Sequence, residues 1–402
     1  MNLERLPWRF RLANQVGRWL GASRLKRARF DLEPLSEEAF ALTGLSDFGD
    51  PGYREGLAVL LESLEDEACL HPIGRFGMRG MILTQLTNRL RFVEQQRRDV
   101  SREVQLIPPL IILGMPRSGT TFLHRLIAEN EAFRYLSFWE LMRPFPGSED
   151  PDERKERVAR ALETRLRMNP NLDRKHFIRA DSPEECIWLL NLTFVSHAYW
   201  VAAPAYSYLD WLNCTDRTRA YREYRKLLEY FQSQQPGKRL LLKAPSHTGS
   251  VQALLSAIPE ALIVQCHRDP VEVLGSFNSL IASVHRVVSD RVEPRKMARA
   301  NLEMLLHEDR LNERYRKEHR PPIHDVFFPD LMRDPIGVVR TIYDTFQLDW
   351  CDRLDEQAGS FLAINPRGKH GIHRYSNEEF GETAESVAER FRSYRSRFGF
   401  DG

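Results

Sequence analysis

The first hundred residues of the 402-residue chain are patterned as helices. Apolar side chains recur every three or four positions through residues 53–70 and again through 76–93, which is the spacing of an amphipathic helix. A second stretch, residues 150–237, is rich in charged and aromatic residues and has weak strand signals, so it also predicts mostly helix. No internal repeat or low-complexity tract interrupts this pattern.

Elsewhere the apolar residues form short continuous runs, which are typical of buried strands. Such runs stand at residues 110–113, 133–136, 239–242, 262–266 and 325–328. Helical spacing returns at residues 120–130, 251–257, 271–283, 295–317, 335–346 and 384–398. Alternating strands and helices predict an α/β fold, with a central parallel sheet flanked by helices on both faces. We therefore expect a helical N-terminal region (1–100) and an α/β domain (101–402) with a helical, substrate-side insertion (150–237).

The segment Gly114-Met-Pro-Arg-Ser-Gly-Thr-Thr121 joins the first predicted strand to a helix through a glycine-rich loop. A strand that passes through such a loop into a helix aims backbone N–H groups and the positive helix end at one point, which is how proteins hold phosphate. The spacing is that of a nucleotide-binding P-loop, but Thr120 stands where a triphosphate-binding loop has lysine. The cation is Arg117 instead, so the loop predicts an anion site that is not built for ATP or GTP.

Polar residues also follow the second, third and fourth predicted strands. In sheets of parallel strands ligands bind outside the carboxyl ends, so we expect these residues to converge on the glycine loop. They are Trp139 and Glu140 after the second strand, Lys243 to His247 after the third, and His267, Arg268 and Asp269 after the fourth.

The sequence Pro116-Arg-Ser-Gly-Thr-Thr121 resembles the phosphosulfate-binding motif of the sulfotransferases that use 3′-phosphoadenosine 5′-phosphosulfate (PAPS). The similarity extends over residues 107–380 and is greatest to the branch with bacterial and tyrosylprotein sulfotransferases. It implies a P-loop-like fold and transfer of a sulfuryl group from PAPS, leaving 3′,5′-ADP, to a hydroxyl or amine. It also implies that the donor's 5′-phosphosulfate is bound by Arg117, Ser118, Gly119, Thr120, Thr121 and Phe122.

Two further motifs resemble parts of the family's 3′-phosphate site. Arg268 at the end of a predicted strand and Ser276 eight residues later match the arginine and serine that hold this phosphate. The planar guanidinium of arginine suits phosphate because it forms paired hydrogen bonds. The late basic loop Arg367-Gly368-Lys369 resembles one that closes over the same phosphate, with its residues in a different order.

The base that takes the acceptor's proton has three candidate positions. Glu140 is the first, because a glutamate at about this distance after the loop acts as base in the tyrosylprotein-like branch that the chain resembles. His247 is second, since its ordinary pKa suits proton transfer, and Lys243 on the same strand is expected to face the site. Glu184 and Glu185 come third. His176 and His197 have no supporting sequence context, and we interpret them as ordinary residues.

Composition limits the partners and the compartment. Lysine and arginine number 58 against 56 acidic residues, and the net charge of +2 gives no general attraction to nucleic acid. Five scattered cysteines without close pairing predict a reducing, cytoplasmic setting rather than disulfides or a zinc site. No run of about 18 apolar residues exists, which predicts no membrane span. Arginine and backbone amides supply the positive field, so we expect no metal requirement.

The acceptor is expected to be a small molecule, lipid or glycan that is at least partly apolar. This hypothesis rests on a dense set of aromatic residues in the insertion, which are Trp188, Phe194, Tyr199, Trp200, Tyr206, Tyr208 and Trp211. The alternative interpretation is that these residues fill the core. Residues 1–30 combine apolar side chains with many arginines. This composition predicts one of three roles: the segment docks on the domain, bridges two subunits of a homodimer, or lies on a membrane surface. We prefer docking on the domain. Two alternatives for the whole protein are a P-loop NTPase or nucleotide kinase and a non-catalytic peripheral membrane or scaffold protein.

Overall fold

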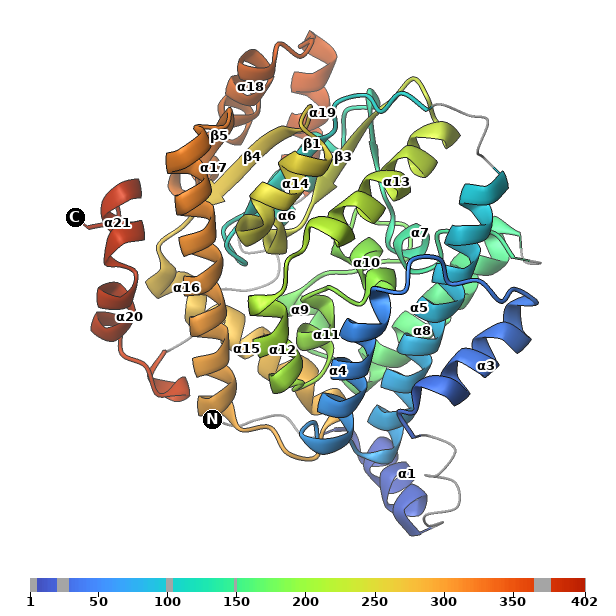
Figure 1. Ribbon diagram of the computed structural model, residues 1–402. Coiled ribbons are helices and arrows are strands. Elements are labelled where there is room, and N and C mark those ends of the chain that lie inside the picture. Colours follow the sequence, from blue (N-terminus) through green and yellow to red (C-terminus); the bar gives the residue numbers. More distant parts are fainter. Residues whose placement is uncertain (1–5, 20–28, 99–103, 148–149, 365–376, 402) are drawn as a thin grey trace.

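The structure is a computed structural model that describes residues 6–19, 29–98, 104–147, 150–364 and 377–401. Its centre is a five-stranded sheet in the order β2-β3-β1-β4-β5, in which every neighbouring pair is parallel (Figure 1). The strands are β1 (Leu110–Gly114), β2 (Phe133–Tyr135), β3 (Arg239–Lys243), β4 (Leu262–His267) and β5 (Ile323–Phe327). The α/β fold with a parallel sheet, predicted from the alternating pattern, is confirmed.

Helices cover both faces of the sheet, which explains why the central strands are apolar throughout. Every residue of β1 is buried. On one face, Ile111 and Leu113 share a core with α13 (Thr218–Gln234) and α14 (Val251–Ala257). On the other, Leu110 and Ile112 pack with α6 (Thr120–Ile127), α18 (Pro335–Phe346) and α19 (Asp352–Ile364).

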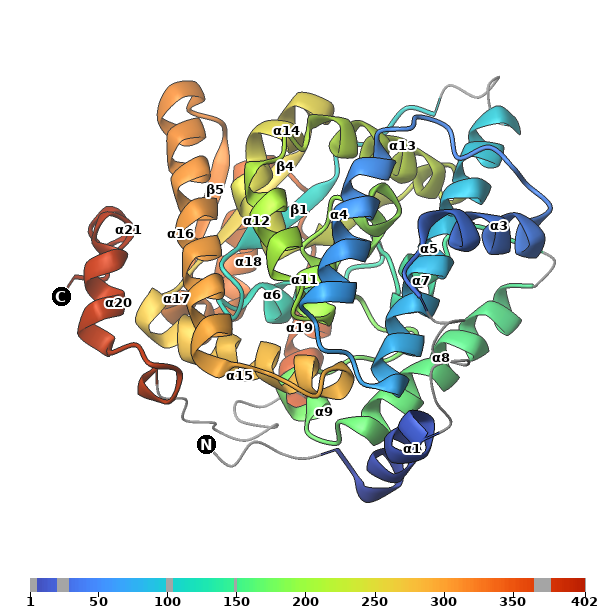
Figure 2. The ribbon, with the colours of Figure 1, turned by 60° about the horizontal axis from the view of Figure 1, so that its bottom comes forward.

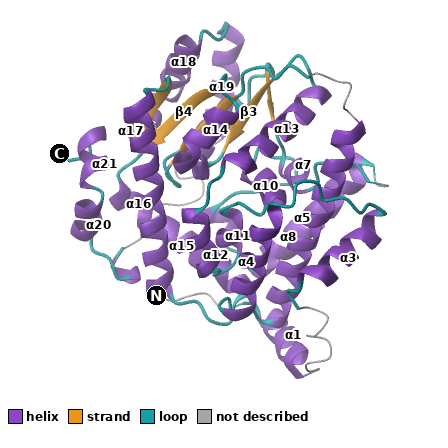
Figure 3. Cartoon of the chain, in the orientation of Figure 1, coloured by secondary structure: helices purple, strands orange, loops and turns teal. Residues whose placement is uncertain are grey.

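The N-terminal region and the insertion form a mainly helical part beside the sheet (Figure 3). The N-terminal helices are α1 (Trp8–Trp19), α3 (Leu32–Thr43), α4 (Tyr53–Asp66) and α5 (Pro72–Arg98). The insertion contributes α8 (Pro151–Met168), α9 (Leu172–Lys175), α10 (Ile187–Leu190), η2 (Asn191–Thr193), α11 (Ala198–Ala202) and α12 (Tyr206–Cys214). One continuous hydrophobic cluster joins α4 and α5 to the sheet, so the N-terminal helices share a core with the α/β part.

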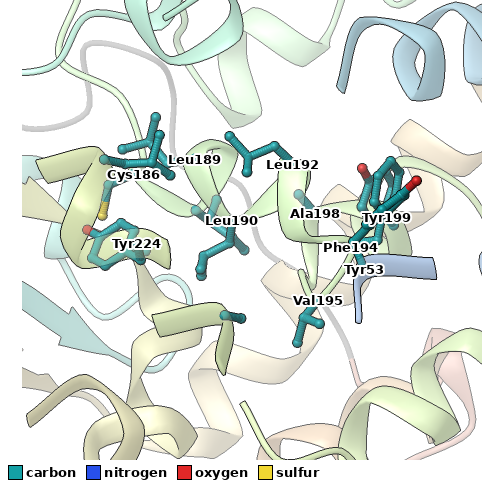
Figure 4. Close-up of a cluster of buried hydrophobic side chains, with 14 of the residues drawn as sticks. Tyr53, Cys186, Leu189, Leu190, Leu192, Phe194, Val195, Ala198, Tyr199 and Tyr224 are labelled. Carbon is teal, nitrogen blue, oxygen red and sulfur yellow. The ribbon is translucent and has the colours of Figure 1, made fainter. Parts of the chain in front are cut away.

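Most aromatic residues of the insertion fill this core. Phe194 stacks on Tyr199 with ring centres 5.7 Å apart, and Tyr53 of α4 packs on Phe194 from the N-terminal side (Figure 4). Tyr199, Tyr208 and Trp200 are fully buried. Of the seven aromatic residues considered for an acceptor pocket, only Trp188 lines the main cavity.

The remaining helices of the described chain follow the strands or close the C-terminal part. They are α7 (Phe138–Met142), η3 (Pro245–Ser250), α15 (Pro270–Val288), α16 (Pro294–His319), α17 (Phe328–Arg333), η4 (Glu378–Phe380), α20 (Ala384–Arg390) and α21 (Arg392–Phe398). The single helix predicted over 384–398 was wrong in one respect, because the chain breaks at Phe391 into α20 and α21. In the part of the chain that is described, no helix is both long and apolar enough to cross a membrane.

Candidate active site

The glycine loop between β1 and α6 has a backbone that few other sequences permit. Gly114 has φ +135°, and a Cβ there would lie 2.2 Å from the carbonyl oxygen of Cys266 on the neighbouring strand β4. Arg117 and Gly119 are also left-handed, with φ +68° and +92°. Gly119 is the N-cap of α6, whose first N–H groups have no partner within the helix. The loop thus presents unpaired amides at its end, as an anion site requires.

A cavity of about 1080 Å³ opens at the carboxyl ends of β1 and β4, in front of this loop. The ligand position predicted from sheet topology therefore coincides with a cavity that the structure contains. The loop contributes to its wall Gly114, Met115, Pro116, Arg117, Gly119, Thr120, Thr121 and Phe122.

Two arginines and a serine from separate motifs meet at this cavity. Arg117 donates from Nε to Ser276 Oγ at 3.1 Å, and Arg268 donates from Nη1 to the carbonyl oxygen of Arg117 at 3.1 Å. The Arg268 guanidinium also lies over the Phe328 ring, 4.0 Å from its centre, which restricts its orientation. The structure therefore brings together the cations and hydroxyl that the sequence assigned to two phosphate groups.

Acidic residues reach the cavity from the insertion. Glu184 N donates to the carbonyl of Leu136 at 3.2 Å, and Cys186 N donates to that of Lys243 at 3.0 Å. This segment consequently crosses the ends of β2 and β3 and places both Glu184 and Glu185 in the cavity wall.

His176 and Glu184 form a dyad at this wall. The ring Nε2 and Glu184 Oε1 are 3.2 Å apart; the Glu184 side chain is 2% exposed and that of His176 is 19% exposed. Burial alone would raise the pKa of Glu184, but the His176 ring, and then Lys243, hold it below its usual range. A buried carboxylate that holds a more exposed imidazole is a standard arrangement for a general base.

Comparison with known proteins identifies the family. The sequence model of the sulfotransferase family matches residues 108–352, more than half of the chain. The chain belongs to the sulfotransferase family. It is also similar to the crystal structure of sulfotransferase STF1 from Mycobacterium tuberculosis H37Rv, with a TM-score of 0.78 and 29% identity over 90% of this chain and 98% of that one.

Two further relatives of this sulfotransferase agree with the assignment. The structure of sulfotransferase STF9 from Mycobacterium avium has the same fold, with a TM-score of 0.79 and 24% identity over 91% of this chain and 96% of that one. The omega-hydroxy-beta-dihydromenaquinone-9 sulfotransferase Stf3 of Mycobacterium tuberculosis is 24% identical over 314 residues, which is 76% of this chain and 78% of the relative. The NTPase, kinase and scaffold alternatives are therefore set aside.

The structure of this sulfotransferase places Glu140, the first candidate base, outside the cavity wall. Its Oε2 accepts hydrogen bonds from Ser137 N at 2.9 Å and Ser137 Oγ at 2.6 Å, and its Oε1 accepts one from Arg134 at 3.1 Å. Glu140 thus closes a capping box at the start of α7. We expected the strand before Glu140 to lie beside the first strand, but β3 lies between β2 and β1, and the Glu140 carboxylate turns back onto its own helix start.

His247 and Lys243 also lie behind the cavity wall. The His247 ring contacts Tyr221 Oη at 2.6 Å and Cys186 Sγ at 3.2 Å, and burial lowers its pKa to about 3. Both ring nitrogens therefore have partners in the core, which corrects the expectation that His247 faces the acceptor. Lys243 is 1% exposed and donates to Glu185 Oε1 at 2.8 Å, so it reaches the site only through that carboxylate.

Two of the predicted contacts to PAPS, Ser118 and the late basic loop, are not among the described residues that line the cavity. Ser118 is fully buried and donates to the carbonyl of Met115 at 2.6 Å, so its hydroxyl holds the loop together rather than lining the cavity. Arg367, Gly368 and Lys369 lie outside the described residues. Before this segment, Phe361 of α19 lines the cavity, and after it Asn377 donates to the carbonyl of Val271 at the start of α15, at 2.9 Å.

The apolar end of the cavity is formed by side chains of helices α15 and α16, together with Trp188 and Val201 of the insertion. The apolar lining side chains from these two helices are Phe277, Leu280, Ile281, Val284, Met304 and Leu305. The same two helices also contribute the polar lining residues Glu272, Ser276, Glu308 and Asp309. One cavity thus combines a cationic end with an apolar end.

Proposed function

We propose that this sulfotransferase transfers the sulfuryl group of PAPS to a hydroxyl of an apolar small-molecule or lipid acceptor. The observation that carries the proposal is the cavity itself, in which the glycine loop, Arg117, Arg268 and Ser276 adjoin a wall of aliphatic side chains. The cationic end matches the two anionic groups of PAPS. The apolar end matches an acceptor whose bulk is hydrocarbon.

The donor occupies the loop in this proposal. The amides at the start of α6, with Thr120, Thr121 and Arg117, hold the 5′-phosphosulfate, and Arg268 with Ser276 holds the 3′-phosphate. Sulfuryl transfer resembles phosphoryl transfer in that positioning and stabilisation of charge on the oxygens account for most of the catalysis. Turnover is expected without added metal, and loss of turnover in EDTA would contradict this part.

His176 replaces Glu140 as our proposed base. With Nε2–H donating to Glu184, the other ring nitrogen, Nδ1, is left to accept the acceptor's hydroxyl proton. The acceptor oxygen then bonds to sulfur as the bond from sulfur to the 5′-phosphate oxygen breaks, and 3′,5′-ADP leaves. Glu184 stabilises the imidazolium that forms. Glu185, held by Lys243, is the second choice.

The relatives support an apolar acceptor, since Stf3 is named for a sulfotransferase reaction on omega-hydroxy-beta-dihydromenaquinone-9. We extend only the chemical class, a hydroxyl on a largely hydrocarbon molecule, to this chain. The test is transfer of radiolabel from PAPS to a panel of hydroxylated isoprenoids, sterols, phenols, sugars and peptides. Labelling of apolar alcohols is expected, and exclusive labelling of sugars or peptides would refute the acceptor class.

The donor is tested separately by thermal shift with 3′,5′-ADP and with ATP plus magnesium. The lysine of a triphosphate-binding loop is absent, so 3′,5′-ADP is expected to stabilise the protein more. Stronger stabilisation by ATP would overturn the donor assignment.

A further inference from the structure

Helix α1 is fixed on the body of the protein by one face. Asn14 is buried and its Oδ1 accepts a hydrogen bond from Ile73 N of α5 at 3.0 Å. A Cβ at Gly17 would lie 2.9 Å from Pro72 Cβ, so the two helices touch closely at this point. Arg18 forms an ion pair with Asp290 at 2.7 Å. These contacts set the orientation of α1 and therefore which side chains it presents to the surroundings.

The opposite face of α1 exposes a stripe of large apolar side chains. Trp8 is 61% exposed, Leu12 51%, Val16 46% and Trp19 85%. Their spacing of four, four and three residues places them on one side of the helix. They are four of the seven exposed large hydrophobic residues in the described part of the chain, and exposure this concentrated marks an interaction surface.

The charge of α1 indicates what covers the stripe. The helix contains no acidic residue and three arginines, Arg9, Arg11 and Arg18, of which Arg18 is paired with Asp290. The adjoining sequence adds Arg24, Lys26, Arg27 and Arg29. Tryptophans at the boundary of an apolar stripe, flanked by arginines, fit the interface of an anionic lipid bilayer. A second copy of α1 is a poorer partner, because it brings a second set of arginines with no carboxylates to balance them.

The anchor of α1 lies at one end of the acceptor wall. His71 is next to the α1 contact at Pro72, and its N–H donates to the carbonyl of Val288 at 3.1 Å. Val288 is the last residue of α15. Val284, one turn earlier on α15, lines the apolar end of the cavity. Figure 2 shows α1 on the same side of the molecule as α9 and α15, both of which contribute residues to the cavity wall.

We propose that α1 is an interfacial helix that binds an anionic membrane surface and holds the apolar end of the cavity next to the bilayer. An apolar acceptor then passes from the bilayer into the cavity over a short path. Binding to the membrane stands independently of the reaction, whereas the advantage for the acceptor rests on the proposed function.

The test is co-sedimentation of the full chain with vesicles of phosphatidylcholine alone and of phosphatidylcholine with phosphatidylglycerol. Binding is expected only to the vesicles that contain phosphatidylglycerol, and it should weaken as salt is raised. The double variant Trp8→Ser/Trp19→Ser should reduce the partition coefficient by about tenfold or more, because both indoles lose their insertion into the interface. Leu42→Ser on α3, an apolar residue about as exposed as Trp8, is the matched control and should bind as the wild type does.

Three results would overturn the proposal: no sedimentation, equal sedimentation with both vesicles, or full binding of the double variant. A dimer that dissociates on Trp8→Ser/Trp19→Ser, without vesicle binding, would assign the stripe to a second copy instead. Binding of 3′,5′-ADP and turnover of a water-soluble acceptor, measured on both variants without vesicles, keep a failure of the proposed reaction distinct from a failure of membrane binding.

Discussion

Arg268 carries the clearest prediction about a single residue. Its guanidinium is positioned by Phe328 and by the carbonyl of Arg117, at the point where the 3′-phosphate is proposed to bind. A hydrogen bond to a charged group contributes about 1.5–3 kcal/mol, so Arg268→Ala should weaken 3′,5′-ADP binding by about tenfold or more. Isothermal calorimetry measures this directly. Arg160→Ala, an exposed arginine on α8, is the control and should leave the affinity unchanged.

The proposed base is tested by separating turnover from donor binding. His176→Asn should lower kcat by about 10²–10⁴-fold, because the proton of the acceptor no longer has a recipient. Glu184→Gln should have a smaller effect in the same direction, since it removes only the orientation and charge behind the ring. Both should retain nearly wild-type affinity for 3′,5′-ADP.

Glu140→Gln is the informative comparison for these variants. Its carboxylate caps α7, so a modest loss of stability is expected with little change in kcat. The opposite pattern, a large loss of kcat in Glu140→Gln and none in His176→Asn, would restore Glu140 as the base.

At the scale of an element, the glycine loop depends on Gly114. A side chain there meets both a strained φ and the carbonyl of Cys266. Gly114→Ala should therefore destabilise the protein by at least about 1–3 kcal/mol and reduce 3′,5′-ADP binding, because β1 and β4 must separate where the loop begins. Urea unfolding measures the first effect. Gly237→Ala, which meets nothing within 4 Å, should change neither quantity.

The elements that sequence reasoning placed well are those whose apolar period is uninterrupted. Continuous runs such as Leu110–Leu113 identified the strands, and topology then located the cavity. Glu140 was misplaced because the apolar pattern predicts where a helix begins but not the direction of a side chain in its first turn, and the Glu140 side chain closes a capping box with Ser137. His176 was missed because the dyad needs the segment near Glu184 to cross the ends of β2 and β3, a long-range contact that has no period in the sequence. Pro183, which bridges to Ser137, leaves no distinctive sequence signal of this contact.

A buried ion pair links the N-terminal helices to the α/β part. Arg89 of α5 is 1% exposed and donates to both oxygens of Glu223 on α13, at 2.8 and 3.0 Å. Arg89→Met leaves the Glu223 carboxylate without its partner, so it should cost about 3–5 kcal/mol of unfolding free energy. Arg97→Met, which removes an exposed ion pair with Asp47, should cost less than about 1 kcal/mol. Two separate transitions, with only one shifted by Arg89→Met, would show that residues 1–100 unfold on their own.

The stability of the whole molecule should fall as the solution becomes mildly acidic. Burial lowers the pKa of four histidines, to about 3 for His124 and His247 and to about 4 for His197 and His285. The unfolded chain binds a proton at each near pH 6.5, whereas the folded protein does not until its lower pKa is reached. Their contribution is therefore complete above about pH 6.5 and is lost as pH falls toward about 4.

Between about pH 4 and pH 6.5, each histidine that is neutral in the folded protein and protonated in the unfolded chain lowers the unfolding free energy by about 1–2 kcal/mol per pH unit of acidification. Urea unfolding at about pH 7.5 and about pH 5.5 should show a steep loss for the wild type. His124→Gln keeps a donor toward the carbonyl of Leu241 but cannot titrate, so its loss should be smaller by about 1 kcal/mol. His319→Gln, at an exposed position, should follow the wild type. Equal pH dependence of His124→Gln and the wild type would mean that His124 takes up its proton in the folded protein too, against the burial that surrounds it.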